Sequence, residues 1–231
     1  MCRATSSCRS GALAASLLGL LALPASGQPV RGGALPTLFP PDNWWNVDVT
    51  AAPVDTNSTS FIQFIGTTRA LHPDFGGDDE ETPPAIYGMV YMTVGGDQAL
   101  EPMAFDYDDQ SDYGAPGRPA GYPIPVEAKT QAKWIEGGYP GNSGADGDKH
   151  MLIVDRDNRI LFETWNTRCV PAGSPSCSWE AGSGAIFRLD SNERRPDTWT
   201  SADAAGLAIL PGLVRYDEAF GASPIRHAFR V

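Results

Sequence analysis

The sequence HMLIVDRDNRILFETW, residues 150–165, carries the clearest strand pattern of the chain. Residues 150–155 and 159–165 are rich in β-branched, aromatic and other apolar side chains, which is typical of strands. Asp and Asn residues separate the two runs and are typical of a tight turn. The stretch therefore predicts a β-hairpin. Because side chains alternate along a strand, His150 and Leu152 are expected on the same face.

Further strand-like runs lie on both sides of the hairpin, at residues 86–94, 102–107, 185–189, 213–216 and 225–231. Residues 59–66 fit one or two helical turns, and residues 200–210 are the strongest helix pattern, with Thr200 as a cap and Pro211 as a stop. Many short strands, 25 Gly and 20 Pro predict a mainly β fold. We expect an antiparallel sandwich or barrel with one short helix near 200–210; an α+β fold is the alternative.

The first 27 residues have the pattern of a cleaved secretory signal peptide. Arg3 and Arg9 precede an apolar run of residues 11–23, and small residues follow Pro24. The run is shorter than the roughly 20 residues that a membrane-spanning helix needs. We therefore expect a secreted or periplasmic protein. Residues 28–37 would then form a flexible leader and residues 38–231 a single globular domain.

Acidic side chains dominate the part that follows this signal. The whole chain has 17 basic and 28 acidic residues, and both arginines of the signal would be lost on cleavage. The remaining 15 basic and 28 acidic residues give a net charge of −13. This charge repels nucleic acid and anionic lipid. Hence we expect no nucleic-acid partner and no membrane contact after cleavage.

Two cysteines remain after cleavage of the signal, Cys169 and Cys177. In an oxidising compartment they are expected to form a disulfide. The bridge would close a nine-residue loop rich in Pro, Gly and Ser. Its spacing fits neither a zinc site nor a redox motif.

Only three histidines follow the signal: His72, His150 and His227. His150 is the strongest catalytic candidate, because it opens a strand after a Gly-rich loop and Asp148 lies close enough in sequence to orient its ring. Asp74 would assist His72 in the same way. Three converging imidazoles would form a metal site with an open position. Three unrelated structural histidines are the alternative.

Carbohydrate chemistry is suggested by further side chains. Paired carboxylates carry out glycoside hydrolysis, and the candidates are Asp74, Glu163, Glu180 and Asp203. Aromatic rings stack on sugars, and the candidates are Trp45, Trp165 and Trp199. Acidic runs at 106–112 and 142–148 contain oxygen ligands for Ca²⁺ but do not match the twelve-residue calcium loop, so no cofactor is assigned. Asn57-Ser58-Thr59 fits the N-glycosylation triplet.

Several segments resemble a family of uncharacterised exported bacterial proteins. They are LHPDFG (71–76), GDKHMLIVDRDNRILFE (147–163), AGSGAIFRLDSN (181–192), WTSADAAGLAILPGLVRYDE (199–218) and IRHAFR (225–230). The resemblance covers most of the chain after the signal but carries no catalytic residue with it. It implies relatives that continue beyond the last segment, so we expect the chain to be truncated at its C-terminal end.

Three functions follow as hypotheses. The first is an enzyme, a glycoside hydrolase in type, acting on extracellular carbohydrate with His150 and Asp148 at its site and His72, Asp74 or His227 contributing. The second is a non-catalytic module that binds glycan or a cell surface. The third is a metal-dependent hydrolase or oxidase that uses the three histidines. The partner is expected to be an extracellular glycan or small molecule.

Overall fold

The predicted hairpin is confirmed and lies at the centre of the fold. A computed structural model describes residues 28–70, 76, 85–142 and 147–230. Strands β4 (Met151–Asp155) and β5 (Ile160–Trp165) pair antiparallel, with Ile153 opposite Phe162. In the turn, Asp155 accepts a hydrogen bond from the backbone N–H of Asn158 at 3.0 Å. Asp155 is therefore a turn former, as its sequence context indicates.

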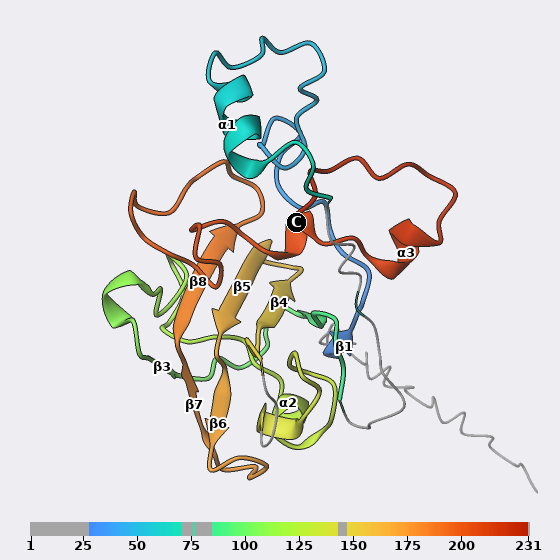
Figure 1. Cartoon of the computed structure of the whole chain (residues 1–231). Helices are drawn as coiled ribbons and strands as arrows, with labels where there is room; N and C mark the ends of the chain where they lie inside the picture. The colour runs from blue at the N-terminus through green and yellow to red at the C-terminus, as the bar shows by residue number, and fades with distance from the viewer. Residues whose placement is uncertain (1–27, 71–75, 77–84, 143–146, 231) are drawn as a thin grey trace, which may run out of the picture.

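The hairpin is part of a five-stranded sheet with the strand order β1-β2-β4-β5-β8 (Figure 1). Its other strands are β1 (Val30–Arg31), β2 (Tyr91–Val94) and β8 (Ser183–Arg188). β2 runs parallel to β4, and the other neighbours are antiparallel. The sheet is thus mixed, although an antiparallel arrangement was expected. β1 lies within the segment expected to be a flexible leader, and it pairs with β2.

A second sheet of three strands lies beyond the lower end of the first one in Figure 1. Its order is β3 (Met103–Phe105), β7 (Ser178–Ala181) and β6 (Arg168–Val170). The predicted disulfide is confirmed, because Cys169 and Cys177 are bonded and close the connection between β6 and β7. The sequence patterns missed β6 and β7, which are short strands on either side of a loop of Pro, Gly and Ser.

The helices are few and short. They are α1 (Ser58–Ile65), α2 (Glu127–Thr130), α3 (Tyr216–Ala219) and the 3-10 turns η1 (Asp108–Gln110), η2 (Pro140–Asn142) and η3 (Leu210–Gly212). Within the described ranges, none has the length and apolar character that crossing a membrane requires. The mainly β fold class is confirmed, and neither sheet closes into a barrel.

The prediction of a helix at residues 200–210 is wrong. This segment is irregular up to η3. Side chains form hydrogen bonds with the backbone N–H and C=O groups that would pair with each other in a helix. The Ser201 hydroxyl donates to the Leu207 carbonyl at 2.6 Å and accepts from the Asp203 N–H at 2.9 Å. Gly206 has a φ of 72°, a left-handed conformation that breaks a helix. Local hydrogen bonding has replaced the helix ladder.

Two strands expected near the C-terminus are also absent. Residues 213–216 lead into α3, where the Glu218 carboxylate accepts from the Arg215 N–H at 3.1 Å and caps the helix. Residues 225–230 form no strand, because their backbone bonds go to separate segments: Ala228 donates to Trp45 and Arg230 to Gly212. The expected strand at 86–94 is limited to β2.

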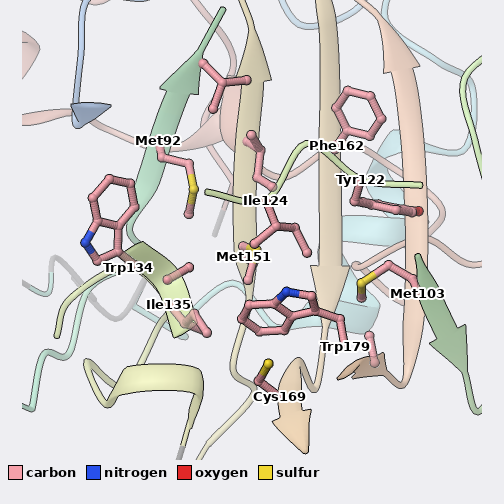
Figure 2. Close-up of a cluster of buried hydrophobic side chains, with 14 of the residues drawn as sticks. Met92, Met103, Tyr122, Ile124, Trp134, Ile135, Met151, Phe162, Cys169 and Trp179 are labelled. Atoms are coloured by element: carbon pink, nitrogen blue, oxygen red, sulfur yellow. The ribbon is translucent and has the colours of Figure 1, made fainter. Parts of the chain in front are cut away.

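Two hydrophobic cores lie on opposite faces of the five-stranded sheet. The first core contains large side chains from both sheets and from the segment between β3 and β4, among them Met92, Tyr122, Ile135, Phe162 and Trp179 (Figure 2). The second core is formed by residues that alternate with these along the strands, among them Leu152, Val154, Leu161, Ala185 and Phe187, and by residues 208–210. The alternation predicted for β4 is thereby confirmed.

Candidate functional site

His150 lies just before β4 on the face of the second core, and it is only 3% exposed. Its Nδ1 atom is 2.7 Å from Glu136 Oε2, and its Nε2 atom is 3.2 Å from the Ala202 carbonyl oxygen. Burial opposes a charge on the ring, but the hydrogen bond and the charge of Glu136 outweigh it and raise the pKa of His150. As an imidazolium, the ring donates to both partners.

Glu136 takes the place that the sequence reasoning gave to Asp148. It contacts the ring directly, and its Oε2 atom also accepts from the His150 backbone N–H at 2.9 Å. Asp148 instead accepts from the indole N–H of Trp165 at 3.3 Å. Its negative charge still favours the protonated form of His150. Glu136 lies 14 residues before His150, so no local sequence pattern links the two.

Glu163 is a buried carboxyl group on β5, on the same face as His150. It is 0% exposed, and its two oxygens accept from the backbone N–H groups of Ile209 and Leu210 at 2.8–3.0 Å. Burial raises the pKa of Glu163 to about 7, although these hydrogen bonds and the charges of His150 and Arg230 act against the shift. The group therefore titrates near neutral pH, as general acids and bases do.

Residues 199–212, called the covering segment here, lie over these two titratable groups. Besides Glu163 and His150, Ser183 on β8 holds the segment, because its hydroxyl donates to the Ser201 carbonyl at 2.8 Å. Arg195 donates to the Thr200 carbonyl at 2.8 Å. Side chains on β5 and β8, together with His150 just before β4, thus fix an irregular backbone against the sheet.

A cleft is lined in part by the covering segment. Aromatic side chains of Trp44, Trp199 and Phe187 line it, together with residues 205–208. Its charged lining residues are Glu193, Arg194, Arg195 and Asp197. Trp44 is 40% exposed, and the Arg195 guanidinium lies 5.4 Å from the centre of the Trp199 ring, where it orients the indole. Ile209 and Leu210, whose N–H groups bond to Glu163, come immediately after cleft-lining residues 205–208 in the sequence.

The remaining predicted aromatic candidates lie elsewhere. Trp45 is 7% exposed and packs in the second core, so its ring is enclosed. Trp165 is half-buried against that core, with its indole N–H directed to Asp148. Of the three tryptophans proposed for substrate binding, Trp199 alone lines the cleft. Trp44, which adjoins Trp45 in sequence, was not singled out, because nothing in the sequence tells which of the two is exposed.

Three further candidates in the described part of the chain, His227, Glu180 and Asp203, bond to other partners and do not add to this cluster. His72 and Asp74 lie outside the described residues. His227 bonds to Glu218, with its Nε2 atom 3.2 Å from a carboxylate oxygen. Glu180 pairs with Arg168 on the smaller sheet, and Asp203 pairs with Arg230 at 2.8 Å. No group of three His, Cys, Asp or Glu among the residues described could hold a metal ion.

Comparison with protein-family models, with curated proteins and with solved structures found no match. The resemblance to exported bacterial proteins stays a prediction.

Proposed function

We propose that this chain binds extracellular carbohydrate in the cleft between Trp44 and Trp199. The observation that carries the proposal is a pair of indole side chains in one open cleft with polar groups around them. Aromatic rings stack on the apolar faces of sugar rings, while side-chain and backbone polar groups bond to the hydroxyls. The same cleft supplies both kinds of contact.

A neutral glycan is the ligand class that the charges favour. Glu193 and Asp197 in the lining are balanced by Arg194 and Arg195, and the whole chain carries a net charge of −11. Such a field disfavours polyuronates and other polyanions. The expected export of the protein would bring it into contact with neutral polysaccharides outside the cell.

The test is a pull-down on insoluble neutral polysaccharides, such as cellulose, chitin and β-glucan, with wild type, Trp44→Ala and Trp199→Ala. We expect each variant to bind about tenfold more weakly, because about 1.4 kcal/mol of stacking is lost. Phe64→Ala is the matched control, since Phe64 is 93% exposed on α1 and is not part of the cleft lining. Equal retention of wild type and both tryptophan variants would refute the proposal.

A hydrolase is the second candidate, and Glu163 is the observation that favours it. A carboxyl group with a pKa of about 7 lies beside His150, and it bonds to Ile209 and Leu210, which directly follow cleft-lining residues 205–208. An acid of this kind protonates a leaving oxygen in glycoside hydrolysis. Catalysis would require the covering segment to move, because Glu163 has no exposed surface.

Reducing-sugar release on the same polysaccharides separates the two functions. If the chain is a hydrolase, Glu163→Gln should abolish release yet retain binding, because the glutamine oxygen can still accept a backbone N–H. Trp199→Ala should weaken both. Binding without release from any substrate by wild type would eliminate the hydrolase and leave the binding module.

A further inference from the structure

The segment that precedes α1 is the most exposed connection in the described chain. Every residue from 47 to 57 is exposed, and α1 itself has no buried residue. In Figure 1 this segment and α1 stand at the top of the molecule, away from the sheets. The Asn57-Ser58-Thr59 triplet lies where this segment enters the helix. None of the other six asparagines of the sequence has Ser or Thr two positions later.

The conformation at Asn57 leaves its side chain available. Asp55 accepts the Asn57 backbone N–H at 2.7 Å and the Ser58 N–H at 3.0 Å, which forms a turn. The Asn57 carbonyl then accepts the first helical bond, from Phe61, at 3.0 Å. The backbone groups are satisfied, whereas the Asn57 carboxamide makes no capping bond and no other bond within the described residues. Thr59 is exposed on the same turn.

We propose that Asn57 is an N-glycosylation site. The amide nitrogen attacks the anomeric carbon of a lipid-pyrophosphate-linked oligosaccharide, and a C–N bond forms as the C–O bond to the pyrophosphate breaks. The lipid pyrophosphate leaves, the amide gives up one proton, and no redox partner is needed. The exposed hydroxyl of Thr59 completes the acceptor triplet that the transferase reads.

The position of this glycan has a physical consequence for α1. Phe61, Phe64 and Ile65 are 59–93% exposed within two turns after Asn57. Exposed apolar side chains that lie this close together favour association between molecules. A hydrophilic oligosaccharide at the start of the helix would keep other molecules away from them. The inference does not depend on the carbohydrate cleft.

The test is to incubate the purified full-length chain with an oligosaccharyltransferase and a lipid-pyrophosphate-linked oligosaccharide. Mass spectrometry then measures the occupancy of the peptide that contains Asn57. We expect a mass gain of one oligosaccharide, which Asn57→Gln and Thr59→Ala abolish. Ser58→Ala is the matched control, because the middle position of the triplet accepts alanine, and this variant should be modified as wild type is.

A synthetic peptide of residues 53–61 serves as the reference acceptor. Modification of both the peptide and the chain supports the proposal. Modification of the peptide alone overturns it, because the triplet would then be inaccessible in the folded protein. Failure of both acceptors, or unchanged modification of Thr59→Ala, also overturns it.

Discussion

The two faces of the five-stranded sheet are covered in different ways, although the same strands supply both. On one face, Phe162 and Met151 pack in a core of large apolar side chains from both sheets. On the other, Glu163 and His150 lie beside Leu152 on the same face and hold an irregular backbone by hydrogen bonds. The first face gains stability from buried apolar area, and the second adds directional bonds that fix one particular backbone conformation. The proposed binding cleft lies over the second face.

The largest effect is expected on the apolar face. Phe162→Ala removes a ring that is 1% exposed and lies edge-on to Tyr122 at 5.4 Å. The loss of buried area and the cavity left behind should lower the free energy of unfolding by about 4 kcal/mol. Urea denaturation followed by tryptophan fluorescence measures it. A loss below about 1 kcal/mol would show that this face is not the main source of stability.

A smaller effect is expected on the polar face when the pH changes. Glu163 titrates at about 7 in the folded protein and near 4.5 when unfolded, so the folded state binds more protons between these values. Its contribution is therefore complete below about pH 4.5 and is lost as the pH rises to 7, up to about 3 kcal/mol. Because the pKa of His150 is also raised, this group too lowers the free energy of unfolding as the pH rises above 6.5. Urea midpoints between pH 4.5 and 8 measure the trend.

Glu163→Gln provides the control for this pH dependence. It should remove the fall in stability between pH 4.5 and 6.5 and leave the part due to His150. If the two proteins lose stability in parallel over that range, then Glu163 is not the group responsible.

The smallest effect is expected from Ser183→Ala. The change removes one buried hydrogen bond to the Ser201 carbonyl and should cost about 1 kcal/mol. We also expect faster amide hydrogen exchange in residues 201–210 than in β5, because only the covering segment is loosened. Uniform exchange across the sheet would contradict the view that this serine fixes the segment locally.

Local sequence patterns predicted the hairpin, α1 and the disulfide, because strand alternation, helical spacing and cysteine pairing act over short distances. The helix at 200–210 failed for the opposite reason. Its cap and stop residues are typical of a helix, but Glu163 takes the N–H groups of Ile209 and Leu210 from a strand 46 residues away. The His150–Glu136 contact was missed because it too depends on the tertiary fold. Propensity is a weak guide where such contacts compete with it.

The parallel pairing of β2 with β4 has a consequence for how the chain folds. Met92 lies opposite Ile153, so 61 residues must close a loop before this pair of strands can form. Closing such a loop has an entropic cost that no local turn offsets, and folding slows as contacts become more distant in sequence. The hairpin of β4 and β5 can form early, but the central sheet is complete only when the two distant parts of the chain meet. We therefore expect slow folding, limited by this long-range closure.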